Sequence, residues 1–118
     1  MKTITVSVEN IMSKEQGDEL KKDYGKPDIG LLPYEFLEGV AKVLDFGAKK
    51  YSRYGWASKD MAYSRIISAA YRHLGKFEKG EQVDEETKLS HLLHLTCCAM
   101  FLYMYTITGL GKDDRWKR

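Results

Sequence analysis

The chain has 118 residues, the size of one ordinary domain with its own apolar core. It carries 19 Lys and Arg against 17 Asp and Glu, and this near balance argues against nucleic acid or an anionic membrane as a partner. The longest apolar run, Leu92 to Leu102, is shorter than the ~20 residues that a membrane span needs. Cys97 and Cys98 are sequence neighbours and suit no loop-closing disulfide, so we expect a reducing, cytoplasmic setting.

The N-terminal part of the chain has no sustained helical period. Residues 2–8 alternate apolar and polar side chains, which predicts a short strand that either pairs in an oligomer or lies as an extended arm. Residues 13–30 are charged and interrupted by glycine and proline, which predicts a loop. We therefore expect a single domain, 1–118, with an arm and loop over 1–30, a helical core over about 33–108 and a frayed tail over 109–118.

Three segments of the core have the apolar period of helices. The first opens at Pro33 and ends near Tyr51, and the second runs over about 61–79. The third runs over about 89–108 and is apolar nearly all round, with Asp84 or Thr87 as its candidate N-cap. The sequence therefore predicts an all-α fold, a small helical bundle with a central buried C-terminal helix and a short N-terminal extended arm or strand.

Histidines gather around the junction of the second and third segments. His91 and His94 are three residues apart and Cys98 is four further on, so all share one side of the third helix. Paired imidazoles can bind one metal ion or act on one phosphate, whereas the simpler alternative is local hydrogen bonding at an exposed helix start. His73, on the apolar side of the second segment, makes a functional role for the group about as well supported as a structural one. A zinc site made by His91, His94 and Cys98 is one form that this role could take.

Carboxylates with a three-residue spacing occur twice. Glu35 and Glu38 lie on adjacent turns of the first helix, a spacing that lets two carboxylates share Mg²⁺ or Mn²⁺. Glu81 and Asp84 repeat the spacing, and Glu86 follows. An ordinary solvated acidic surface is the simpler explanation of both groups, so the spacing alone does not establish a metal site.

Basic and aromatic side chains near these groups suit a nucleotide. Lys and Arg hold polyphosphates through charge-assisted contacts and flat rings stack on bases, although surface solubility and core packing are their ordinary roles. The candidates for substrate binding are Lys26, Lys49, Lys50, Tyr51, Trp56, Arg72 and His73. The chain has no P-loop motif, no Cys-x-x-Cys pair and no His-Asp dipeptide, which disfavours the enzyme classes that use them.

Taken in order, these residues resemble a family of small bacteriophage proteins related to dATP/dGTP diphosphohydrolases and, more distantly, the MazG-type nucleotide pyrophosphohydrolases. The resemblance covers roughly residues 24–105. The matching positions are Gly25-Lys26-Pro27, Leu31-Leu32-Pro33, Glu35, Glu38, Phe46-Gly47-Ala48-Lys49-Lys50-Tyr51, Trp56, Arg72-His73-Leu74, Gly80-Glu81, Asp84, Glu86 and His91-Leu92-Leu93-His94.

The resemblance implies an all-α, commonly oligomeric protein that cleaves a deoxynucleoside triphosphate with magnesium. In the MazG-type enzymes a Glu-x-x-Glu helix faces a Glu-x-x-Asp helix and the carboxylates hold the metal. Glu35 and Glu38 match the first of these helices. The second half departs from the pattern, because Glu81 and Asp84 fall at a helix end.

We therefore expect a homo-oligomer that hydrolyses a purine deoxynucleoside triphosphate to the monophosphate and pyrophosphate with Mg²⁺ or Mn²⁺, in the host cytoplasm if the protein is a phage's. The expected proton acceptor is Glu38 or Glu86. The expected metal ligands are Glu35, Glu38, Glu81, Asp84, His91 and His94. The alternative is a noncatalytic phage protein that binds a nucleotide or a host protein.

Overall fold

The computed structural model describes residues 24–117. The chain divides into two units, Met1–Leu31 and Leu32–Arg118. In the described part of the first unit, residues Ile29–Leu31 form a short 3₁₀-helix, η1, inside the segment predicted as a loop. The strand predicted over residues 2–8 lies outside the described residues.

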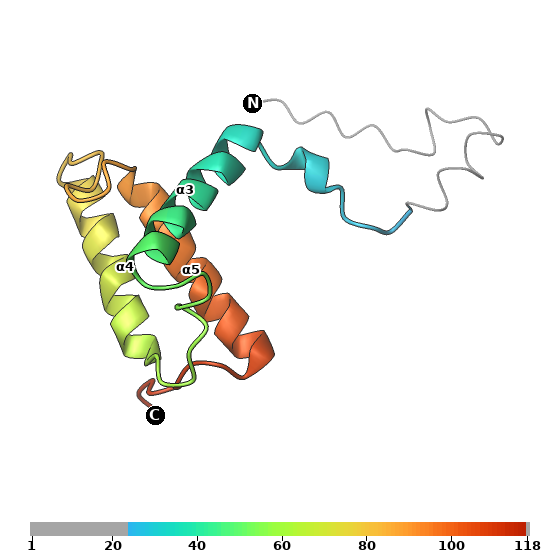
Figure 1. The fold of residues 1–118 in the computed structure, drawn as a ribbon, viewed down its shortest axis with the longest axis vertical. Coiled ribbons are helices and arrows are strands. Elements are labelled where there is room, and N and C mark those ends of the chain that lie inside the picture. Colours follow the sequence, from blue (N-terminus) through green and yellow to red (C-terminus); the bar gives the residue numbers. More distant parts are fainter. Residues whose placement is uncertain (1–23, 118) are drawn as a thin grey trace. The chain divides into compact units, whose positions relative to one another are not determined.

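Three α-helices form the second unit: α3, Tyr34–Lys50; α4, Tyr63–Glu78; and α5, His91–Thr108. Figure 1 shows α4 and α5 side by side and running in opposite directions, with α3 crossing α5. Residues 24–117 hold no β-strand. The predicted all-α bundle is therefore confirmed, and the helix ends lie close to the predicted positions.

The C-terminal helix is the central one, as predicted, because α5 contacts both α3 and α4. His91, Cys98 and Tyr105 follow one another at seven-residue intervals and are all buried, as expected for one face of a helix. Gly39 of α3 lies against Leu93 of α5, where a Cβ atom would come within 2.7 Å of a Leu93 methyl group. The missing side chain of Gly39 thus lets α3 approach α5 closely.

A serine caps α5. The Ser90 hydroxyl accepts a hydrogen bond from the backbone N–H of Leu92 at 3.1 Å, so the prediction that Asp84 or Thr87 is the N-cap is wrong. All three residue types are good N-caps, and the loop conformation decides which of them meets the helix end. Gly109 ends α5 in the left-handed conformation, with φ 77°.

The C-terminal tail is anchored to α4, which corrects the prediction of a frayed tail. Asp114 accepts hydrogen bonds from both the backbone N–H and the hydroxyl of Ser64, in the first turn of α4. The backbone N–H of Tyr63 donates to the carbonyl of Lys112 at 3.0 Å. Ala62, at the N-cap position of α4, has no side-chain acceptor, so Asp114 takes the capping role from a distant part of the chain.

Aromatic rings fix the connector between α3 and α4 against α5. Trp56 stacks on Phe101 with ring centroids 5.2 Å apart, and Tyr63 stacks on Tyr105 with centroids 5.8 Å apart. The buried Tyr105 hydroxyl donates to the backbone carbonyl of Trp56. These contacts hold the connector in one position beside the helices.

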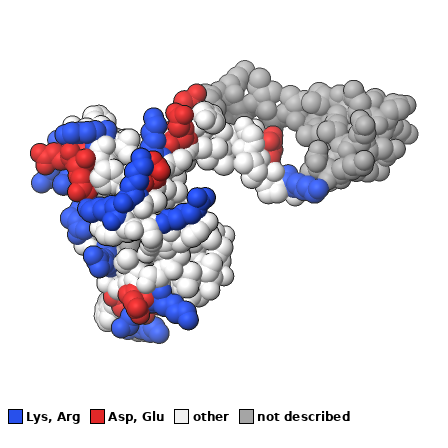
Figure 2. All heavy atoms as spheres, in the orientation of Figure 1, with Lys and Arg blue, Asp and Glu red and all other residues white. Residues whose placement is uncertain are grey.

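The outer face of the bundle is apolar in places. Tyr103 and Ile107 of α5 are 63% and 58% exposed. On the face in Figure 2, charged side chains of both signs are interspersed over part of the second unit, and another part is free of them. By length and composition alone α5 would suit a membrane span, but its contacts with α3 and α4 are those of a bundle helix.

Candidate active site

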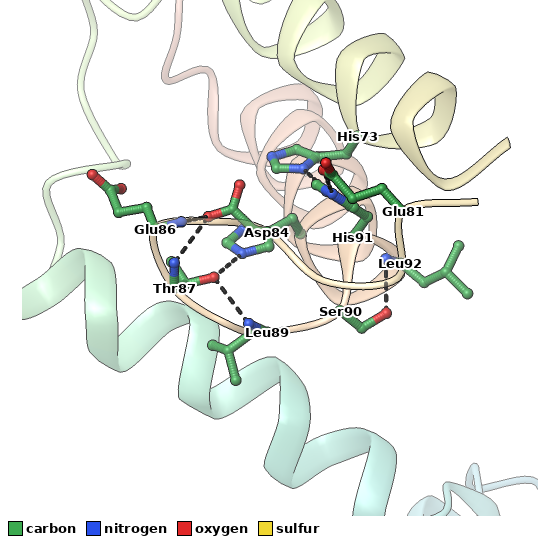
Figure 3. Close-up of polar contacts among 10 residues, drawn as sticks. His73, Glu81, Asp84, Glu86, Thr87, Leu89, Ser90, His91 and Leu92 are labelled. Atoms are coloured by element: carbon green, nitrogen blue, oxygen red, sulfur yellow. Dashed lines mark hydrogen bonds and ion pairs between the residues drawn. The ribbon is translucent and has the colours of Figure 1, made fainter. Parts of the chain in front are cut away.

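Three imidazole rings from α4 and α5 meet at one end of the bundle (Figure 3). His73 stacks on His94, with centroids 4.6 Å apart and planes 7° from parallel. The Nδ1 atom of His73 lies 2.9 Å from the Nδ1 atom of His91. The antiparallel packing of the helices explains this meeting, because it places the end of α4 beside the start of α5.

His91 is fully buried and has a partner on each ring nitrogen. Its Nε2 lies 2.5 Å from a carboxylate oxygen of Glu81, a half-exposed residue of the α4–α5 loop. A carboxylate can only accept, so His91 donates from Nε2. In the neutral ring, Nδ1 then presents its lone pair toward His73. The simpler alternative is therefore wrong about the exposure of His91 but right that this histidine hydrogen-bonds locally.

Asp84, in the α4–α5 loop, lies close to the rings of His73 and His91. Burial alone would raise the pKa of Asp84, but the backbone N–H groups of Thr87 and Glu86 and the charge of His94 bring this pKa below its ordinary value. The carboxyl group is therefore ionised at neutral pH. One ligand atom from each of His73, Asp84 and His91 lies within 4.8 Å of the other two; these three residues are called the histidine–aspartate cluster below.

Burial keeps two of the rings neutral. It lowers the pKa of His73 to about 4, and the charges of His94 and His91 act in the same direction. Burial also lowers the pKa of His94, although the charge of Asp84 opposes it. The Nε2 atom of His94 lies 2.7 Å from the hydroxyl of Thr87. At neutral pH each of these two rings thus has one N–H donor and one nitrogen lone pair.

The α4–α5 loop is folded tightly enough to present its acids to the rings. Two backbone hydrogen bonds tie Asp84 to the turn that follows it. The N–H of Asp84 donates to the carbonyl of Leu89, and the N–H of Lys88 donates to the carbonyl of Asp84, both at 2.8 Å. Lys88 has φ 62°, the left-handed region that side chains other than glycine's rarely adopt. The backbone N–H of His91 donates to the carbonyl of Gln82 at 3.0 Å. This backbone network sets the positions of Glu81 and Asp84.

A pocket of about 440 Å³ lies between the end of α3, the connector and α4. Its lining is mostly apolar, and the charged residues in it are Arg53, Arg65 and Arg72. The rings of Tyr51 and Trp56 contribute to the lining. A mostly apolar pocket with a few charged groups is typical of small-molecule sites.

Arg72 relates the pocket to the cluster. It lines the pocket and directly precedes His73 on α4. Burial raises the pKa of the Cys98 thiol, and the charge of Arg72 opposes that effect. Cys98 follows His94 by one helical turn. Arg72 lines the pocket and His73, the next residue of α4, belongs to the histidine–aspartate cluster, whose three residues are not among those that line the pocket.

Comparison with protein families matches residues 16–115 to a family described as "dATP/dGTP diphosphohydrolase, N-terminal". The chain belongs to this family. Over 96 residues it is 34% identical to the "dATP/dGTP diphosphohydrolase" of Salmonella phage PMBT28, in an alignment covering 81% of this chain and 32% of that relative. The chain thus spans about a third of the length of the curated relative. No solved structure matches.

In this member of the diphosphohydrolase family, the first predicted acid pair stays on the surface. Glu35 and Glu38 are exposed on α3, and Glu38 lies 3.9 Å from Lys42 in an ordinary i,i+4 ion pair. Within residues 24–117, the one group of three potential metal ligands includes neither acid. Glu81 and Asp84 lie in the α4–α5 loop and on no helix, so the described chain has no second acidic helix of the MazG type.

The predicted lysines have other partners. Lys49 lies 3.1 Å from Asp45 along α3. Lys50 reaches Glu86 at 3.3 Å, and this contact raises the pKa of Lys50. The ion pair ties the end of α3 to the α4–α5 loop. Lys26 belongs to the first unit of the chain.

Sequence analysis missed several residues of the site. Arg53 and Phe101 line the pocket, and neither was among the predicted site residues. Thr87 was considered only as a cap, whereas its hydroxyl binds His94. Trp56 was predicted to stack on a base, and one face of its ring is occupied by Phe101. These roles depend on the folded connector and loop, which local sequence patterns do not specify.

Proposed function

We propose that this chain hydrolyses a purine deoxynucleoside triphosphate to the monophosphate and pyrophosphate. The observation that carries the proposal is the arginine-containing pocket, with the first residue of the histidine–aspartate cluster directly after Arg72 on α4, in a chain of the dATP/dGTP diphosphohydrolase family. The name of the phage relative supports dATP and dGTP as the substrate class.

The pocket supplies the binding groups. Guanidinium groups bind phosphate oxygens through paired, charge-assisted hydrogen bonds, so Arg53, Arg65 and Arg72 hold the triphosphate in this proposal. The apolar wall accepts the base, with the exposed ring of Tyr51 at its edge. The arginine charges also stabilise the negative charge that develops on the departing pyrophosphate.

Hydrolysis at the α-phosphorus also needs an acceptor for the proton of the attacking water. Glu86 remains the proposed acceptor because it is an exposed carboxylate two residues from Asp84 on the same loop. Its ion pair with Lys50 holds the carboxylate near the end of α3. Water then forms the new bond to the α-phosphorus, the bond to the bridging oxygen breaks, and pyrophosphate leaves.

The Mg²⁺ or Mn²⁺ expected from the resemblance stays a prediction. The cluster offers two imidazole nitrogens and one carboxylate, whereas Mg²⁺ prefers oxygen ligands throughout. The cluster therefore does not fit magnesium, and the proposed roles of the arginines and of Glu86 do not involve it. Mn²⁺ accepts imidazole more readily than Mg²⁺ does.

The test is product analysis with the purified 118-residue chain, supplied with dGTP or dATP and with Mn²⁺ or Mg²⁺. We expect the deoxynucleoside monophosphate and pyrophosphate in equal amounts. Glu86→Gln should reduce turnover roughly 100-fold because it removes the proton acceptor. Glu85→Gln, on the neighbouring exposed residue, is the matched control and should leave turnover unchanged. Binding of the nucleotide without any release of pyrophosphate would favour the noncatalytic alternative.

A further inference from the structure

We propose that His73, Asp84 and His91 form a binding site for a divalent transition-metal ion of the Mn²⁺, Co²⁺ and Zn²⁺ class, with Glu81 orienting His91 from behind. The inference deepens the proposed function and rests on it for what the ion would serve. The experiment that tests the inference measures metal binding alone and does not depend on hydrolysis.

The spacing of the two ring nitrogens suits a shared ion. Imidazole nitrogens bind Zn²⁺ at about 2.0–2.1 Å, so two of them on one ion lie roughly 2.8–3.4 Å apart for ligand angles between 90° and tetrahedral. The Nδ1 atoms of His73 and His91 are 2.9 Å apart. A slight opening of this contact, with the His73 proton on Nε2, turns both lone pairs toward one ion. The carboxylate of Asp84 lies within reach of the same point.

Glu81 accepts the hydrogen bond that a metal-binding histidine usually donates from its second ring nitrogen. A histidine that binds metal through one nitrogen usually donates its other N–H to a carboxylate, which fixes the ring and its tautomer. His91 makes this contact through Nε2, 2.5 Å from Glu81, and leaves Nδ1 for the ion. The ring is fully buried, so its orientation is set before an ion arrives.

The donor set selects the class of metal. Two imidazole nitrogens and one carboxylate oxygen suit first-row transition ions, and hard ions such as Mg²⁺ and Ca²⁺ favour oxygen-only sites. The set also differs from the zinc site predicted from His91, His94 and Cys98. In the structure Nε2 of His94 hydrogen-bonds to the hydroxyl of Thr87, and the ring of His73 stacks on the face of His94. His94 therefore serves to position His73 and is not one of the proposed ligands.

The experiment uses the full chain without a histidine tag, stripped with a chelator and checked for folding by circular dichroism. Co²⁺, Zn²⁺, Mn²⁺ or Mg²⁺ is added, and metal content after gel filtration, melting temperature and the visible spectrum of the cobalt form are measured. We expect one Co²⁺ or Zn²⁺ per chain, a melting temperature raised by several degrees and no response to Mg²⁺. The cobalt spectrum should show nitrogen and oxygen ligation without a sulfur-to-cobalt charge-transfer band.

Substitutions of the proposed ligands test where the ion binds. Asp84→Asn and His73→Gln should abolish stoichiometric retention, and Glu81→Gln should weaken binding about 10–100-fold because it removes only the orienting carboxylate. Glu85→Gln is the control on the same loop and should bind as the parent does. Retention unchanged in Asp84→Asn, a sulfur band from Cys98, or binding of Mg²⁺ alone would overturn the proposal. Metal binding without hydrolysis would instead contradict only the proposed function, and hydrolysis without transition-metal binding only the metal site.

Discussion

His91 connects the loop, α4 and α5 through one buried ring. Its two nitrogens contact His73 and Glu81, and no buried side-chain nitrogen or oxygen in the described part of the chain lacks a partner. A buried polar group that loses its partner costs free energy, so a change at His91 disturbs both contacts at once. Conservative changes at its neighbours are therefore the better probes of this site.

The backbone conformation of Lys88 costs folding free energy. Its φ of 62° is unfavourable for any residue with a Cβ atom, and it closes the turn that carries Asp84. Lys88→Gly should raise the free energy of unfolding by about 1 kcal/mol, measured by urea denaturation. Lys88→Ala, which keeps the Cβ, is the control and should have little effect. Equal stability of Lys88→Gly and Lys88→Ala would show that the turn is not strained.

Individual site residues were predictable only in part. The sequence indicated the histidines and the loop acids, because several ionisable groups near one helix junction are unusual in a small domain. It did not separate Glu81 and Asp84, which lie at the rings, from Glu35 and Glu38, which lie on the open surface of α3. The two pairs have identical spacing, and burial depends on tertiary packing that spacing does not encode.

At the scale of elements, α4 depends on the tail for its cap. Asp114→Ala should lower the melting temperature by a few degrees because it removes the acceptor for two hydrogen bonds from Ser64. Asp113→Ala breaks an exposed ion pair with Arg115 and a local hydrogen bond from the Arg115 backbone N–H, and it should have a smaller effect. Thermal melts of both variants make the comparison. A larger loss in Asp113→Ala would contradict the capping role of Asp114.

The helices were predictable from the sequence, whereas the contacts that cap them and anchor the tail were not. The apolar period placed α3, α4 and α5 close to their observed ends, because a helix face is a local property of the sequence. The cap of α4 comes from Asp114, far along the chain, so no local signal at Ala62 reveals it. The same reason explains why the tail was expected to fray.

For the whole molecule, the exposed apolar side chains favour association. Tyr103 and Ile107 stand one helical turn apart on α5 and are mostly exposed. We predict that the chain forms a homo-oligomer at micromolar concentration and that the double change Tyr103→Glu and Ile107→Glu shifts it toward the monomer. Analytical ultracentrifugation measures both, with Lys59→Glu, an exposed change in the connector, as the control. A wild-type monomer across the concentration range would contradict the prediction.

We expect the catalytic centre to lie at the α4–α5 loop and not on the acidic surface of α3. The most direct measurement compares dGTP turnover by the parent chain, Asp84→Asn and Glu38→Gln under identical conditions, with folding checked for each. The account predicts at least a 100-fold loss, about 3 kcal/mol of transition-state stabilisation, in Asp84→Asn and a change of less than about threefold in Glu38→Gln. Full activity in Asp84→Asn together with an inactive Glu38→Gln would contradict it and move the centre to α3.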